Sequence, residues 1–202
     1  ADCLFDQCAE LKSVTIPASV RRIGKEAFAG CAALETISLP ETLEEIGPDA
    51  FKGCEKLKSI ALPAAARIGE RAFAGCANLR EIRVPEGCRT IGRNAFSNCE
   101  SLALVSLPDS LGAIAKFAFA GCKALKEVTI PAGVTEIGEG AFLDCAAAEY
   151  SLPAGLKSIG CSAFRSDFAK VTVHVPLKKP FLSQPAGWDK NWAGKGVKVR
   201  WQ

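Results

Sequence analysis

The chain of 202 residues is 49% hydrophobic and 23% charged, which provides enough apolar material for a core and an ordinary surface. Its formal net charge is +3 at pH 7, so overall charge gives no reason to expect nucleic acid or an anionic membrane as a partner. No apolar run approaches the roughly 18 residues that a membrane-spanning helix needs, so membrane insertion is not expected. The sequence has no Met and begins inside a repeat, so we expect that upstream residues, and any targeting segment among them, are missing.

A unit of about 23 residues recurs through most of the chain. The first complete copy is LKSVTIPASVRRIGKEAFAGCAA at 11–33, and LETISLPETLEEIGPDAFKGCEK follows at 34–56. Further copies begin at 57, 79, 102 and 125, and a divergent copy begins at 148. A period in this range is typical of solenoids, in which each coil is covered by its neighbours. We therefore predict one array over residues 1–176, with about eight coils of which the first is partial.

Each copy opens with a short segment that reads as a strand. Val14, Thr15 and Ile16 alternate apolar and polar side chains, which is the pattern of a half-buried strand. A proline then follows, and proline cannot donate a hydrogen bond to a strand ladder. We expect every strand to stop at the same height, at Pro17, Pro40, Pro63, Pro85, Pro108, Pro131, Pro153 and Pro176.

The second half of each copy carries an apolar pair, a glycine and a phenylalanine. In the first copy these residues are Val20, Ile23, Gly24 and Phe28. The glycine is expected to provide either a positive φ or room for a close approach between coils. Segments such as KEAF and ERAF suggest one short helical turn, and the phenylalanines should stack into a buried spine: Phe5, Phe28, Phe51, Phe73, Phe96, Phe119, Phe142 and Phe164.

Ten cysteines raise the question of disulfides or a metal site. One column holds Cys8, Cys31, Cys54, Cys76, Cys99, Cys122 and Cys145. In-register side chains point the same way, so a disulfide between neighbouring coils would be strained, and a linear ladder cannot surround a metal tetrahedrally. We predict buried, reduced thiols in this column, a core position for Cys88, and more reactive thiols at Cys3 and Cys161.

The repeat pattern L-x-x-I-x-L-P-x-x-L-x-x-I-G-x-x-A-F-x-G-C-x-x resembles the BspA-like class of leucine-rich repeats over residues 4–176. That resemblance implies a leucine-rich repeat solenoid of α/β class, right-handed, with a parallel sheet on its inner face and short helical turns or irregular segments outside. It also implies a role in adhesion or protein contact and an extracytoplasmic location, at the cell surface, in the periplasm or secreted. The motif carries no catalytic residues.

Residues for catalysis are hard to find in this sequence. The one histidine, His174, lies in the alternating segment VTVHV, where Val171, Val173 and Val175 are expected to face inward. A catalytic histidine would need a nucleophile and an orienting acid that the sequence does not mark out. No phosphate loop or HExxH motif occurs. We predict a protein that is not an enzyme and has no cofactor and no metal.

Candidate partner-binding residues lie at the positions that the repeat leaves free. By the resemblance, the outward positions of the inner sheet include Thr15, Ser38, Ala61, Arg83, Leu104, Ser106, Thr129 and Ser151. Phe117 joins them because the fifth repeat replaces polar positions by apolar ones, and exposed apolar clusters mark interaction sites. Leu104 and Phe117 are expected on different faces of the coil. The alternative is that Ser and Thr simply suit an exposed strand.

After Pro176 the repeat ends, and residues 177–202 contain Trp188, Trp192 and Trp201. We predict a C-terminal cap here, with a final strand in VKVRW whose cations protect the sheet edge. The alternative is a basic and aromatic patch for glycans or anionic partners.

The function predicted from these observations is a protein–protein interaction or adhesion module of a bacterial secreted, periplasmic or surface protein. Its partner would be a protein, for example a host extracellular protein or another with an apolar surface. The alternative is a structural spacer or a self-associating scaffold without a dedicated ligand, that is, a homo-oligomer.

Overall fold

The computed structural model describes residues 1–64, 66–147, 149–167, 169–177 and 185–202. These residues form short strands joined by turns, and no helix occurs among them. The strands are β1 (Ser13–Thr15), β2 (Arg22–Ile23), β3 (Thr36–Ser38), β4 (Glu45–Ile46), β5 (Arg67–Ile68), β6 (Glu81–Arg83), β7 (Thr90–Ile91), β8 (Leu104–Ser106), β9 (Ala113–Ile114), β10 (Glu136–Ile137), β11 (Glu149–Ser151), β12 (Ser158–Ile159), β13 (Thr172–Val175) and β14 (Lys198–Trp201).

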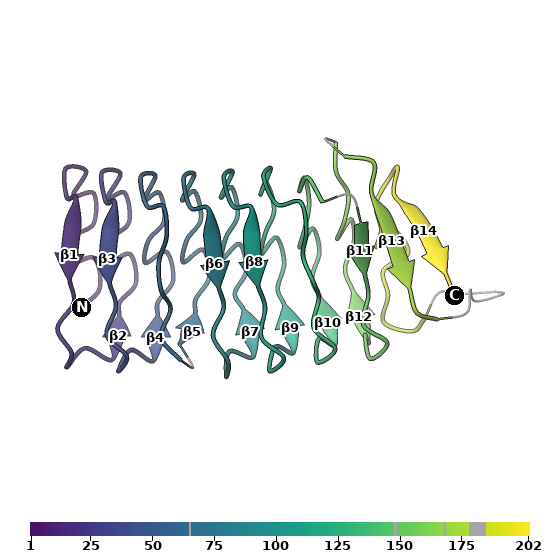
Figure 1. Cartoon of the computed structure of the whole chain (residues 1–202), viewed down its shortest axis with the longest axis horizontal. Helices are drawn as coiled ribbons and strands as arrows, with labels where there is room; N and C mark the ends of the chain where they lie inside the picture. The colour runs from purple at the N-terminus through teal and green to yellow at the C-terminus, as the bar shows by residue number, and fades with distance from the viewer. Residues whose placement is uncertain (65, 148, 168, 178–184) are drawn as a thin grey trace.

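The coils stack side by side into an elongated solenoid with two strand ladders (Figure 1). One ladder is a seven-stranded parallel sheet in the order β12-β10-β9-β7-β5-β4-β2. The other consists of three parallel pieces, β1-β3, β6-β8 and β11-β13-β14. We call the outward side of this second ladder the front face, including the equivalent positions Ser59, Ala61, Glu127 and Thr129 of coils where no strand is assigned. The predicted parallel solenoid of about eight coils is confirmed.

Repeat equivalence is preserved residue by residue in both ladders. On the front face Ser13 pairs with Thr36 and Glu81 pairs with Leu104, while in the other ladder Ile23 pairs with Ile46. Each front strand except β14 ends one or two residues before the proline of its repeat, as expected for a residue without an amide hydrogen. Equivalent side chains of neighbouring coils therefore stand next to each other along the whole array.

The glycine column provides close approach rather than positive φ. A Cβ on Gly92 would lie 2.7 Å from the Gly69 carbonyl oxygen of the preceding coil, and Gly69 is equally close to Gly47. Positive φ falls two residues later, at Glu26 (φ 54°) and at the equivalent residue of later coils. Because helices need negative φ, the segments after the glycine form turns and not the expected short helical turns.

The phenylalanine spine is present as predicted. Successive rings from Phe5 to Phe164 stack nearly parallel, with centroids 5.2 to 5.7 Å apart. Phe51, Phe73 and Phe96 have no exposed surface. Burying each such side chain contributes roughly 1.5–3 kcal/mol to stability, so the spine supplies a large part of the apolar stabilisation.

The cysteine column lies beside the spine, and all ten cysteines are free thiols. Six of the seven column members are buried, whereas Cys8 in the first coil is exposed. Each buried thiol donates to the backbone carbonyl of the phenylalanine in the preceding coil, as Cys99 does to Phe73 at 3.1 Å. Burial raises the pKa of the Cys54 and Cys99 thiols to about 12, so they stay protonated and neutral. The same carbonyls also accept the backbone N–H of the cysteine in their own coil, as Phe73 does from Cys76 at 3.2 Å, so the thiol adds a second hydrogen bond that links neighbouring coils.

At the C-terminal end, aromatic side chains change their geometry. Trp192 meets Phe164 edge-on, at 6.2 Å and 89°, and Trp188 lies against Trp192 and Trp201. The predicted final strand is β14, which pairs in parallel with β13. That residues 177–202 act as a separate cap stays a prediction, and residues 178–184 of this segment lie outside the described residues.

Candidate functional site

The front face carries a hollow of about 750 Å³ over its central coils. Four neighbouring coils contribute to it, and its lining includes Ser59, Ala61, Glu81, Arg83, Leu104, Ser106, Glu127 and Thr129. Beneath these outward residues the alternating positions Ile82, Val105 and Val128 form the floor. Because side chains alternate along a strand, two residues per coil face outward here. The hollow therefore has a floor of repeat-column residues and an outward rim of positions that the repeat leaves variable.

Two rows of side chains run across the coils on this face. The first row contains Ser59, Glu81, Leu104 and Glu127, and the second contains Ala61, Arg83, Ser106 and Thr129. Strand pairing places Glu81 opposite Leu104 and Arg83 opposite Ser106. Neighbouring strands lie about 4.8 Å apart, so adjacent members of a row are within reach of a single ligand side chain.

Leu104 is the exposed large apolar side chain of this surface, with 64% of its surface accessible. It stands between two acidic positions of the first row, in a ring of polar and charged side chains. Most other large apolar side chains of the described residues are buried or half-buried, Leu4 in the first coil being the other exception. The rigid sheet therefore presents an apolar contact surface within a polar rim.

Of the nine predicted binding residues, the structure brings five into the hollow: Ala61, Arg83, Leu104, Ser106 and Thr129. Thr15, Ser38 and Ser151 are exposed on the same face, on β1, β3 and β11, outside the hollow. Glu81 and Glu127 were not among the nine, although their repeat positions already marked them as outward-facing. These two glutamates matter because they lie beside Leu104. Recognising this depends on how neighbouring coils are aligned.

Phe117 lies apart from this surface. It is half-buried and has a positive φ of 56° in the turn after β9. A Cβ on Gly140, the equivalent residue of the next coil, would come within 2.3 Å of the Phe117 ring, so the ring occupies the space over that glycine. Phe117 and Leu104 therefore do not form one apolar patch, which agrees with their expected placement on different faces.

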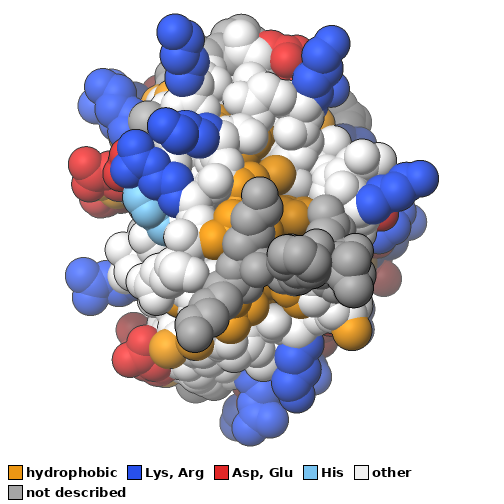
Figure 2. Space-filling view, turned by 90° about the vertical axis from the view of Figure 1, so that its right-hand side faces the viewer, with side chains coloured by type: hydrophobic (Ala, Val, Ile, Leu, Met, Phe, Trp, Pro, Cys, Tyr) orange, Lys and Arg blue, Asp and Glu red, His pale blue; other side chains and the backbone are white. Residues whose placement is uncertain are grey.

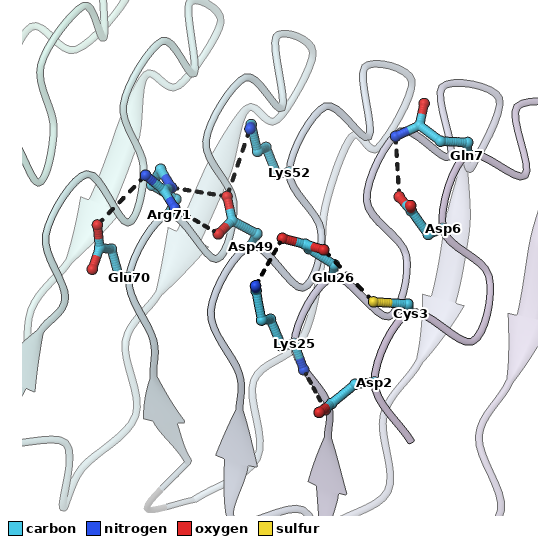
Figure 3. Close-up of polar contacts among 10 residues, drawn as sticks. All are labelled: Asp2, Cys3, Asp6, Gln7, Lys25, Glu26, Asp49, Lys52, Glu70 and Arg71. Atoms are coloured by element: carbon cyan, nitrogen blue, oxygen red, sulfur yellow. Dashed lines mark hydrogen bonds and ion pairs between the residues drawn. The ribbon is translucent and has the colours of Figure 1, made fainter.

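The same column of turns carries a network of charges near the N-terminal end (Figure 3). The Asp49 side chain is only 2% exposed and accepts two hydrogen bonds from Arg71, at 2.8 and 2.9 Å. Lys52 adds a further ion pair at 3.7 Å. A buried carboxylate needs such partners because it has lost its water. The ion pairs with Arg71 and Lys52 compensate for this burial, so Asp49 has a structural role.

A second hollow of about 1060 Å³ lies at the C-terminal end, next to Trp192 and Trp201. Figure 2 shows apolar side chains gathered at the centre of this end and cations around its rim. Among the cations that line the hollow, Arg165 is bound by both carboxylate oxygens of Asp167, at 2.8 and 3.0 Å. Cations and tryptophans do lie together at this end, but the Arg165 guanidinium in the lining is already paired with a carboxylate.

Groups for catalysis or metal binding do not converge in the part of the chain that the structure describes. No cluster of three or more metal-ligating side chains occurs among those residues. His174 is partly exposed and faces Glu149 across the strands, with 3.8 Å between its Nε2 and a carboxylate oxygen. Val171, Val173 and Val175 are buried as predicted. Within the described ranges no helix is long and apolar enough to cross a membrane.

Comparison with known proteins fits the repeat geometry. The sequence profile described as BspA type Leucine rich repeat region matches residues 1–105 and 49–170, with six copies. The chain belongs to the BspA-type leucine-rich repeat family. No curated protein matches its sequence significantly.

Three solved bacterial structures are similar to this leucine-rich repeat chain. A leucine-rich repeat protein from Bacteroides ovatus is 29% identical, with a TM-score of 0.74, over 100% of this chain and 58% of its own length. A leucine-rich repeat protein of T. pallidum is 38% identical, with a TM-score of 0.68, over 70% of this chain and 67% of its own. A leucine-rich cell surface protein from Faecalibacterium prausnitzii is 28% identical, with a TM-score of 0.69, over 87% and 57%. This chain therefore spans less than two thirds of the first and third of these relatives.

Proposed function

We propose that this leucine-rich repeat chain is a non-catalytic module that binds a protein partner outside the cytoplasm through its front face. The observation that carries the proposal is the central hollow, in which Leu104 is 64% exposed and ringed by polar side chains. An exposed leucine contributes little burial energy to folding. The coils before it carry Ser59 and Glu81 at the same position, so the fold does not require a leucine there. Its burial by a partner would supply the binding energy instead.

The construction of the face also favours binding to a protein. Four of its outward residues, Glu81, Arg83, Leu104 and Ser106, lie on the paired strands β6 and β8. The ladder fixes the backbone of these strands, so binding there costs little conformational entropy. The surface is broad and shallow, which suits a macromolecule better than a small molecule enclosed on most sides. The similarity to a leucine-rich cell surface protein supports an extracytoplasmic location. A host extracellular protein is the partner that adhesion at a bacterial surface would require.

Biolayer interferometry of the purified chain against immobilised host extracellular matrix proteins tests the proposal. We expect that Leu104→Glu weakens capture at least about tenfold, since a central anchor is lost and a charge is introduced. Thr90→Glu is the matched control, because Thr90 is also exposed but lies on β7 of the other ladder. Thr90→Glu should unfold at the same temperature as the parent, and Leu104→Glu slightly below it, because the new carboxylate lies beside Glu81 and Glu127.

Two results would contradict the proposal. One is capture that Leu104→Glu leaves unchanged, or that Thr90→Glu weakens as much. The other is light scattering that shows concentration-dependent oligomers disrupted by Leu104→Glu, together with no captured protein. That second result would assign the front face to self-association and favour a scaffold.

A further inference from the structure

The charge pattern in the first row of the hollow indicates which kind of partner segment would fit there. Glu81 pairs with Leu104 across β6 and β8, and Glu127 holds the equivalent position of the next coil, so the two carboxylates stand two coils apart on either side of Leu104. At about 4.8 Å per coil their Cα atoms are about 10 Å apart. Within the described residues, neither carboxylate takes part in an ion pair or a side-chain hydrogen bond, whereas Glu149, further along the row, faces His174. Two unpaired acids thus flank one exposed apolar side chain.

The cations near this row do not neutralise it within the hollow. Arg83 is the lining cation; it lies two residues beyond Glu81 on β6, about 7 Å away along the strand, in the second row. Arg80 and Lys126 are exposed just before the front-face positions and do not line the hollow. A ligand lying along the first row would meet carboxylates on its path and a guanidinium at its side.

We infer that this hollow accepts an extended, polyproline-II-like segment of a partner protein that carries two basic residues three positions apart. Polyproline II rises about 3.1 Å per residue with three residues per turn, so residues i and i+3 point the same way about 9.3 Å apart. That spacing matches the separation of Glu81 and Glu127. The inference rests on the proposed function and adds the chemistry of the partner.

Each part of the hollow would have a role in holding such a segment. The two carboxylates would each accept charge-assisted hydrogen bonds from one basic side chain. The aliphatic stems of these side chains would cover Leu104 from both sides, because long cations bury their methylene groups while the charge stays outside. Arg83 would donate to a carbonyl of the segment, since a polyproline II backbone has no internal hydrogen bonds.

Fluorescence anisotropy with labelled hexapeptides can test this specificity without knowledge of the natural partner. The probe is a proline peptide with arginines at its second and fifth positions. The spacing control has the same composition with the arginines adjacent, and the charge control has glutamates in their place. We expect the first peptide to bind at least about tenfold more tightly than either control, and more weakly as salt is added.

Variants of the chain locate the binding. Glu81→Gln combined with Glu127→Gln should reduce affinity for the first peptide at least about tenfold, because both charge-assisted contacts are lost. Leu104→Ala should reduce it about threefold through the loss of stem packing. Glu136→Gln is the matched control: this glutamate is also exposed and has no ion pair within the described residues, but it lies on β10 of the other ladder.

Three outcomes would overturn the inference: no saturable binding of the first peptide, equal binding of the adjacent-arginine peptide, or an equal loss in the Glu136→Gln variant. These outcomes are separable from failure of the proposed function. If a captured protein depends on Leu104 but not on Glu81 or Glu127, the face binds a protein and the dibasic specificity is wrong.

Discussion

The spine and the front face are built by the same coils, but equivalent positions of neighbouring coils hold the same residue in the spine and different residues on the front face. Along the spine, Phe73, Phe96 and Phe119 each stack on the same residue of the next coil. On the front face, equivalent positions hold Ser59, Glu81 and Leu104. A spine side chain is covered by its own equivalents, so every coil must supply the same shape. A front-face side chain is covered by water, so each coil is free to differ.

The strongest test of this comparison is truncation of one spine residue. Phe96→Ala should lower the free energy of unfolding by about 3–5 kcal/mol, because the ring is fully buried between two others and leaves a cavity. Leu104→Ala, in the next coil, should change it by less than about 0.5 kcal/mol. Urea denaturation followed by circular dichroism measures both. Similar values for the two variants would refute the division between spine and face.

The cysteine column extends the comparison to pH. Burial raises the pKa of the Cys99 thiol to about 12, whereas an unfolded thiol titrates near its ordinary value of about 8.5. The neutral thiol is therefore favoured in the folded state. Its contribution to stability is complete below the unfolded pKa and is lost as pH rises toward the folded value.

Thermal unfolding at pH 7, 9 and 11 checks this prediction. The parent chain should lose stability steadily above pH 9, and a buried thiol such as Cys99 should account for about 3 kcal/mol of that loss at pH 11. Cys99→Ala should show a shallower loss over the same range, although it starts from a lower stability at pH 7. A slope that Cys99→Ala leaves unchanged would contradict a buried, neutral thiol at this position.

A smaller effect compares two ion pairs of similar length and different burial. Arg71→Ala removes both hydrogen bonds from the nearly buried Asp49 carboxylate and should cost about 2 kcal/mol. Lys123→Ala removes a 2.7 Å pair with Glu100 in which both side chains are about half exposed, and should cost less than about 1 kcal/mol. Chemical denaturation of the two variants in parallel gives the difference. Equal costs would show that burial of Asp49 has no energetic consequence.

Much of the fold follows from the sequence because repeated contacts produce repeated residues. The proline stops, the stacked phenylalanines and most strand positions were predictable, since each must satisfy the same neighbour in every coil. Residues 57–62 and 125–130 carry the strand pattern but form no strand. The helical turn was wrong for a local reason. The sequence KEAF suits a helix, but the chain must reverse within a few residues to begin the next strand, and it does so through a positive φ at Glu26.

The candidate site was predictable only in part. Position within the repeat was enough to place Ala61, Arg83 and Leu104 on an outward face. It could not show that Glu81 and Glu127 flank the exposed Leu104 with no ion-pair partner among the described residues, because that depends on register and on what neighbouring coils leave uncovered.

Phe117 illustrates the same limit from the opposite side. Phe117 was a candidate because the fifth repeat carries apolar residues at positions that are polar elsewhere. Its ring instead packs over Gly140 of the next coil, where there is no side chain in its way. The sequence by itself thus determined the solenoid, its spine and its reduced thiols, because these arise from contacts between identical positions. Only the tertiary structure decided which variable residues stand together, because their surroundings come from different coils.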